Sequence, residues 1–121
     1  MSEQDVSRFL TKCKIAVQFR LLFNYKKIEN KQTLLDLGYL EDDVIAEIME
    51  LDVTNYIKGP EEDEDGYGGD FWFFGKVIQN REIYIKLKIK NFDDNGEKQL
   101  SCLCFSFHFA KYKLNILDST K

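Results

Sequence analysis

The chain contains a single proline and seven glycines among its 121 residues, and it has no long apolar run. So little proline and glycine argues against a disordered or low-complexity protein. A membrane-spanning helix needs about 18 or more consecutive apolar residues. The first ten residues, MSEQDVSRFL, lack the basic and then apolar pattern of a signal peptide. We therefore expect an ordered cytoplasmic protein with no membrane partner.

Cysteine and histidine are also scarce. The chain has three cysteines, no CxxC motif and one histidine, His108. Structural zinc sites take four such ligands at characteristic spacings, so we expect no metal and no other cofactor. Cys102 and Cys104 would point the same way from one strand, which is a poor geometry for a mutual disulfide. We expect reduced, partly buried thiols.

The rest of the composition is typical of a globular protein. Hydrophobic residues make up 44% of the chain, charged residues 31% and aromatic residues 14%. A chain of this length can bury one sizeable core, so we expect a single domain over residues 1–121. The aromatic content, with ten phenylalanines and six tyrosines, favours substantial β structure.

The formal net charge of −4 conceals two acidic segments. Residues 41–52 and 61–70 each contain six acidic residues and no basic one. Outside them, nine acidic residues face seventeen basic ones, an excess of eight positive charges. Acidic and basic regions on different surfaces are compatible with a nucleic-acid groove. Composition alone favours the simpler interpretation, which is a solvated acidic helix and loop beside ordinary surface lysines.

The spacing of apolar residues changes along the chain. Apolar residues three and four apart predict one amphipathic helix from residue 3 to about 25 and a second over about 41–51. The acidic, glycine-rich segment 61–70 predicts a loop. Strands are predicted over residues 70–78, 82–90 and 100–109, with a hairpin signal at Asn95-Gly96. This pattern predicts an α+β fold with two N-terminal helices packed on one face of a three- or four-stranded antiparallel sheet.

Alternation along a strand places successive side chains on opposite faces of a sheet. Strand 82–90 has an apolar face of Ile83, Ile85, Leu87 and Ile89, opposite Tyr84, Lys86, Lys88 and Lys90. Strand 100–109 has an apolar face of Leu103, Phe105, Phe107 and Phe109, opposite Cys102, Cys104, Ser106 and His108. Because the helices should cover the apolar face, the open face should gather Tyr84, Lys86, Ser106 and His108.

Such an open face is suited to binding and cleaving RNA. Lysines hold phosphates, a tyrosine stacks on or hydrogen-bonds a base, and a histidine transfers protons. The simpler interpretation is a solvated surface on which a single histidine has no special role. The residue types alone leave both interpretations open.

Four fragments occur in an order found in one family of proteins. LDVTNYIKGP, GGDFWFFGK, EIYIKL and CLCFSFH lie between Leu34 and Ala110, and together they resemble MqsR-type toxins of bacterial type II toxin–antitoxin modules. The resemblance implies a RelE-like fold and an mRNA interferase, with mRNA as substrate, a cognate antitoxin as partner and no direct DNA binding. It also implies metal-independent cleavage, in which the 2′-hydroxyl attacks the adjacent phosphate and leaves a 2′,3′-cyclic phosphate.

Matching the fragments position by position implies which residues act. The family's catalytic lysine on its first strand falls on Lys58, and the tyrosine of its YxK strand falls on Tyr84. The position after SF, a lysine in the best-known branch, is His108 here. We expect these three residues to be catalytic, and the resemblance does not assign the general acid and the general base. The residues expected to contact substrate are Lys86, Ser106 and Trp72.

Two features depart from the family pattern. Phe73 stands where a catalytic glutamine is expected, and the chain is acidic whereas the family toxins are usually basic. In the toxin hypothesis, the acidic segment 61–70 should be separate from a positively charged open face, and RNA binding should weaken with salt. The alternative is a non-enzymatic interaction or immunity protein that binds a basic partner through segment 61–70. The sequence leaves both hypotheses open.

Overall fold

In the computed structural model, which describes residues 2–65 and 68–114, three α-helices accompany a five-stranded sheet. The helices are α1 (Glu3–Phe19), α2 (Ile28–Leu37) and α3 (Glu41–Met49), and a 3-10 turn covers Val53–Asn55. The strands are β1 (Leu21–Phe23), β2 (Tyr56–Glu62), β3 (Asp70–Ile78), β4 (Arg81–Asp94) and β5 (Glu97–Phe109). The α+β class is confirmed. The helix and strand counts differ from the prediction, because α2 and the short strand β1 were not expected.

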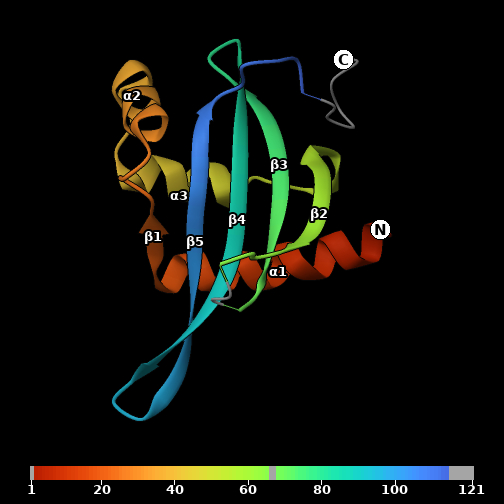
Figure 1. The fold of residues 1–121 in the computed structure, drawn as a ribbon, viewed down its shortest axis with the longest axis vertical. Helices are drawn as coiled ribbons and strands as arrows, with labels where there is room; N and C mark the ends of the chain where they lie inside the picture. Colours follow the sequence, from red (N-terminus) through yellow and green to blue (C-terminus); the bar gives the residue numbers. More distant parts are fainter. Residues whose placement is uncertain (1, 66–67, 115–121) are drawn as a thin grey trace.

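The sheet has the strand order β1-β5-β4-β3-β2. Strand β1 runs parallel to β5, and the other neighbours are antiparallel, so the sheet is mixed. Figure 1 shows α1 and α3 on one side of the sheet, α2 beside β5, and the β4–β5 hairpin extending beyond the other strands. We call the side covered by α1 and α3 the inner face and the opposite side the outer face. Within the described ranges, no helix is both long and apolar enough to cross a membrane.

Helix α1 begins at a capping signal in the sequence but ends earlier than predicted. The Ser2 side chain accepts a hydrogen bond from the backbone N–H of Asp5, which satisfies one of the unpaired donors at the helix start. The buried residues of α1 follow a helical spacing and are Val6, Leu10, Cys13, Ala16 and Val17. The helix ends at Phe19 rather than near residue 25, because Arg20 is extended and the chain then pairs with β5 as β1. The spacing of apolar residues continued into β1 and hid this boundary.

Helix α2 buries polar residues, which is why apolar spacing did not predict it. The Asn30 side-chain oxygen accepts from the backbone N–H of Phe107 at 2.9 Å, and its side-chain nitrogen donates to the Phe105 carbonyl at 3.0 Å. Thr33 Oγ1 accepts from the backbone N–H of Phe109 at 3.2 Å. These bonds give partners to backbone N–H and C=O groups at the edge of β5, beyond the end of its pairing with β1. The helix therefore takes the place of a longer β1 at this edge of the sheet.

The two hairpin turns follow the sequence signals closely. Asn95 and Gly96 both have positive φ, 52° and 82°, between the paired residues Asp94 and Glu97. Two left-handed residues match the right-handed twist of the flanking strands. The turn between β3 and β4 has the same form at Gln79 and Asn80, with φ of 52° and 66°. The predicted hairpin at Asn95-Gly96 is confirmed, and the second turn falls in the short gap between the predicted strands 70–78 and 82–90.

The register between β4 and β5 contains one irregularity that changes which side chains share a face. Lys86 pairs with Ser106, whereas the next residue, Leu87, pairs with Cys104. Phe105 is therefore an extra residue in β5, that is, a β-bulge. Since side chains alternate with a period of two, one extra residue exchanges the faces on one side of the bulge.

The bulge makes the predicted face assignment right for one half of β5 and wrong for the other. Beyond it, Phe107 is buried on the inner face, and Ser106 and His108 belong to the outer face, as predicted. Before it, Cys102 and Cys104 are buried in the inner core, and Leu103 lies on the outer face. Phe105 itself packs against Phe71 on the outer face, with ring centroids 5.3 Å apart, so its predicted place in the inner core was wrong.

Candidate functional site

Five of the six predicted site residues lie on the outer face. Tyr84 and Lys86 come from β4, and Ser106 and His108 sit opposite them on β5. Lys58 reaches the same face from β2, with its Nζ 4.5 Å from the centroid of the Phe73 ring. Side-chain alternation on β4 and on the second half of β5 accounts for this grouping.

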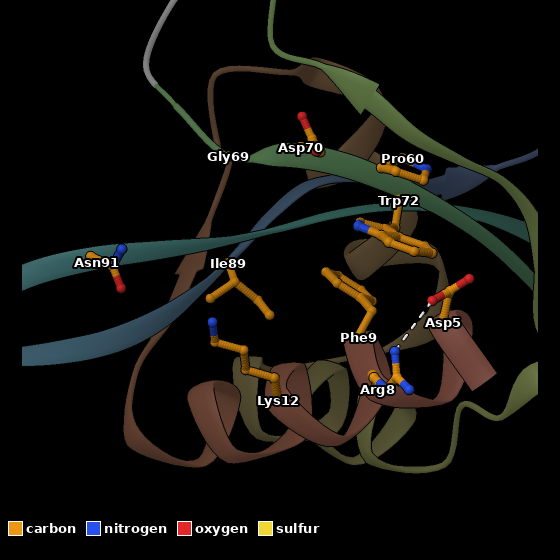
Figure 2. A pocket seen from close by; sticks show the side chains of 10 residues that line it. All are labelled: Asp5, Arg8, Phe9, Lys12, Pro60, Gly69, Asp70, Trp72, Ile89 and Asn91. Carbon is orange, nitrogen blue, oxygen red and sulfur yellow. Dashed lines mark ion pairs between the residues drawn. The ribbon is translucent and has the colours of Figure 1, made fainter. Parts of the chain in front are cut away.

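The sixth residue, Trp72, lies on the inner face and is not brought to this group. Its ring stacks on Phe9 of α1, with centroids 4.7 Å apart. Figure 2 shows both rings in a separate pocket of about 540 Å³, beside Lys12 and the ion pair of Arg8 with Asp5. Trp72 and Phe73 are consecutive in β3, so alternation sends Phe73 to the outer face and Trp72 away from it.

His108 and Tyr84 form a direct cross-strand pair. Their ring centroids are 5.4 Å apart, and His108 is only 8% exposed. Burial lowers the pKa of His108 and the charges of Lys27 and Lys111 lower it further, against the opposing effects of the Phe109 carbonyl and Glu29. The imidazole is therefore neutral at pH 7.

A hydrogen bond fixes the tautomer of this neutral imidazole. His108 Nδ1 lies 3.0 Å from the Phe109 carbonyl oxygen. A carbonyl oxygen can only accept, so Nδ1 carries the proton and Nε2 carries the lone pair. The pKa of Tyr84 is raised by burial and by the charge of Glu61, which keeps its hydroxyl protonated at neutral pH. The pair thus combines a proton acceptor, Nε2, with a proton donor, the Tyr84 hydroxyl.

Lys86 is enclosed by aromatic rings. Its Nζ lies 4.2 Å from the ring centroid of Phe71, 4.7 Å from that of Phe105 and 5.2 Å from that of Phe73. Burial lowers the pKa of Lys86, the charges of Lys27 and Lys58 lower it further, and Glu61 and Asp63 oppose this. Among the residues that the structure describes, Lys86 has no carboxylate within ion-pair distance.

Phe73 links Lys58 to the Tyr84–His108 pair. The Phe73 ring lies under the Lys58 ammonium group, and its centroid is 6.0 Å from that of Tyr84. Lys58 is also ion-paired with Glu61, at 3.1 Å between Nζ and the carboxylate, and both side chains are about half exposed. Phe73 stands where the resemblance implies a glutamine. Its side chain offers an aromatic ring to Lys58 and Tyr84 and no hydrogen bond.

Lys27 belongs to this group although the sequence did not single it out. Its Nζ donates to the buried Ser106 hydroxyl at 2.9 Å and lies 5.5 Å from the centroid of the Phe105 ring. Lys27 stands immediately before α2, in a segment that was interpreted only as a break between helices. Recognising α2 and its contact with β5 would have been needed to find it.

The acidic segment folds onto the outer face and is not separate from it, contrary to the expectation from the sequence. Asp63 forms an ion pair with Lys88, whose side chain is 1% exposed. A groove of about 420 Å³ lies between residues 61–65 and the side chains of Lys86, Lys88 and Lys90. Strand β2 also continues through Glu62, so the predicted start of the loop at residue 61 was two residues too early.

The three cysteines are free, as expected, and they are fully buried where partial burial was predicted. Cys13 and Cys102 have their Sγ atoms 3.5 Å apart between α1 and β5. A hydrogen bond with Cys13 and burial raise the pKa of Cys102, and burial raises the pKa of Cys104. Within residues 2–65 and 68–114, no three histidine, cysteine or acidic side chains are placed to share a metal ion.

Comparisons with models of known protein families, with curated proteins and with solved structures found no match for this chain. We call the outer-face residues Lys27, Lys58, Tyr84, Lys86, Ser106 and His108 the outer-face cluster. Its chemistry is the basis for a functional interpretation. That chemistry consists of a neutral imidazole, a protonated phenol, three lysines and a buried hydroxyl, placed on aromatic rings.

Proposed function

We propose that this chain is an endoribonuclease similar to MqsR-type toxins, with a RelE-like fold, that cleaves mRNA on its outer sheet face. The observation that carries the proposal is the cross-strand pair of Tyr84 and His108, with Lys86 on the same strand as Tyr84 and Lys58 two strands away on β2. RNA cleavage by its own 2′-hydroxyl needs a base, an acid and positive charge near the phosphate. The cluster contains a side chain for each of these tasks.

The arrangement favours His108 as the general base. Its Nε2 lone pair takes the proton of the 2′-hydroxyl, and the resulting oxygen attacks the adjacent phosphorus. The bond from phosphorus to the 5′-oxygen breaks, the Tyr84 hydroxyl supplies the proton to that oxygen, and a 2′,3′-cyclic phosphate remains. Lys58 and Lys86 stabilise the negative charge that develops on the phosphate oxygens.

In a cell, this activity would require a protein that blocks the outer face. We propose a cognate antitoxin in that role, in keeping with the resemblance, and a cytoplasmic location where mRNA is accessible. The alternative, an interaction protein that binds a basic partner through segment 61–70, is less well supported. Two acids of that segment, Glu61 and Asp63, are already paired with lysines of this chain.

The proposal is tested with purified protein and a single-stranded RNA, separating the products on a gel and analysing their 3′ ends. Wild-type protein should leave 2′,3′-cyclic phosphates, and an all-2′-deoxy substrate should stay intact. His108→Ala should reduce the cleavage rate by about 10²–10⁴-fold, the usual contribution of a general acid or base. EDTA should not change the rate, since every step is assigned to a side chain.

A matched pair of tyrosine variants sharpens the test. Tyr84→Phe removes only the proposed donor and should lower the rate, whereas Tyr25→Phe removes a hydroxyl that bonds Glu41 away from the cluster and should not. Circular dichroism of each variant checks that the fold is retained. Wild-type protein that leaves RNA intact, or His108→Ala protein that cleaves at the wild-type rate, would refute the proposed function.

A further inference from the structure

Lys27 is held in place by contacts on both sides. Its Nζ donates to Ser106 Oγ at 2.9 Å, and the helix that follows it is bonded to the β5 edge through Asn30 and Thr33. The backbone carbonyl of Lys27 also accepts from the backbone N–H of Asn30 at 3.1 Å. The ammonium group is therefore fixed over β5.

Lys86, on the neighbouring strand β4, contacts the same aromatic ring as Lys27. The two ammonium groups lie 5.5 Å and 4.7 Å from the centroid of one ring, that of Phe105, and Lys86 is paired in register with Ser106. Two like charges on one aromatic ring repel each other, and partial burial increases the repulsion. Such an arrangement is stabilised by an anion between them.

The protein supplies no such anion within the described residues. The ion pairs recorded there engage Arg8, Lys58, Lys76 and Lys88, and none engages Lys27 or Lys86. Ser106 is fully buried and its hydroxyl oxygen accepts from Lys27, so this residue positions the Lys27 ammonium group. Two ammonium groups thus lie beside the Phe105 ring, and no described carboxylate is within ion-pair distance of either.

We propose that Lys27 and Lys86, with Lys27 positioned by Ser106, form an anion site beside Phe105 that binds a phosphate group. The site deepens the proposed function, on which its place in RNA binding rests, because it lies beside the Tyr84–His108 pair and would hold a phosphate of the substrate there. The ligand class is a phosphate with at least two free oxygens, since one oxygen for each lysine satisfies both ammonium groups.

The site is tested with inorganic phosphate as the probe, so that the test does not depend on RNA cleavage. Binding is measured by calorimetry and by NMR of the His108 ring, which is the chain's sole histidine, with chloride at matched ionic strength as the reference. Wild-type protein should bind phosphate saturably. Lys27→Gln and Lys86→Gln should each weaken binding by about tenfold or more, since each removes a charge-assisted hydrogen bond.

Two further variants control for loss of net charge. Lys26→Gln alters the neighbour of Lys27, and Lys90→Gln alters the same face of the same strand as Lys86; each should change phosphate affinity by less than about twofold. The NMR titration gives a second readout. Lys27→Gln should raise the pKa of His108, because the charge of Lys27 lowers it, while Glu29, Lys111 and the Phe109 carbonyl remain unchanged.

The outcomes separate this proposal from the proposed function. No saturable phosphate binding, or equal weakening in Lys26→Gln and Lys27→Gln, would overturn the anion site even if RNA is cleaved. Phosphate binding that depends on Lys27 and Lys86 in a protein that does not cleave RNA would keep the anion site and refute the endoribonuclease.

Discussion

The outer face has two ends that place lysines on phenylalanine rings in opposite electrostatic settings. At the acidic end, formed by Glu61, Asp63 and Lys88, the buried lysine is paired with a carboxylate from the chain itself. At the histidine end, formed by Lys27, Tyr84, Lys86, Ser106 and His108, none of the described carboxylates pairs with the lysines. A buried cation needs a counter-charge. At the acidic end Asp63 supplies this counter-charge, so the pair has a structural role. At the histidine end no described carboxylate supplies it, so the lysines are available to a ligand.

The largest expected effect is at the acidic end. Asp63→Asn leaves the ammonium group of Lys88 buried without a partner, so the melting temperature should fall by about 10 °C or more. Glu64→Gln removes the same charge two residues from the end of β2 and should leave the melting temperature nearly unchanged. Thermal unfolding followed by circular dichroism measures both. Adding Lys88→Met to Asp63→Asn should recover much of the loss, and failure of Asp63→Asn to destabilise would remove the distinction between the two ends.

The second prediction concerns the support of the histidine end. Asn30→Ala leaves the buried backbone N–H of Phe107 without its acceptor and removes one of the two amide donors to the Phe105 carbonyl, the other being Asn24. It should lower the free energy of unfolding by about 1–3 kcal/mol. It should also weaken phosphate binding, because Lys27 would lose its fixed position. Denaturant unfolding checks the first expectation. Gln32→Ala, on the exposed side of α2, is the control and should have little effect on either measurement.

A smaller effect should follow from releasing Lys58. Its ion pair with Glu61 is half exposed, and such pairs contribute little to stability. Glu61→Gln should therefore leave the fold unchanged, while RNA affinity rises about two- to fivefold and its dependence on salt becomes steeper. Glu62→Gln removes the same charge from the neighbouring residue, for which no ion pair is recorded. Equal effects of the two variants on RNA binding would show that overall charge, and not the Lys58 pair, limits affinity.

The smallest expected effect is the pH dependence of stability at the histidine end. Because the pKa of His108 is lowered in the folded protein, the unfolded chain binds more protons between that value and the ordinary value of about 6.5. Stability should therefore rise with pH through this window and be lost as the pH falls through it. Denaturant unfolding of wild type and His108→Gln from about pH 7.5 to about pH 5.5 isolates this contribution. Parallel curves for the two proteins would contradict it.

The candidate site shows where the alternation of side chains along a strand predicts the structure reliably. Strict alternation placed Tyr84 and Lys86 on one face of β4, and the pairing with β5 brings Ser106 and His108 beside them, as predicted. Alternation depends only on backbone geometry, so it holds wherever a strand is regular. It failed for Cys104 and Phe105 because a bulge is set by the pairing of two strands and leaves no signature in the alternation of either one.

Other parts of the site depend on contacts between distant segments. Lys27 became visible only with α2, which is held to β5 by buried Asn30 and Thr33 and not by an apolar stripe. The acidic segment was expected to stay away from the lysines, but Asp63 pairs with Lys88, which is 25 residues away in the chain. The composition gives the charges of these residues and says nothing of their partners.

The sequence by itself determined the α+β class, both hairpin turns and the side of β4 that carries Tyr84 and Lys86, because these depend on residues close together in the chain. The tertiary structure decided which of the described lysines pair with a carboxylate and which do not. Asp63 directly follows β2, and the pairing of β2 in the sheet brings it to Lys88. The packing of α2 on the β5 edge brings Lys27 to the Phe105 ring that Lys86 also contacts. Electrostatic pairing depends on distance in space, and neither distance follows from the spacing of residues along the chain.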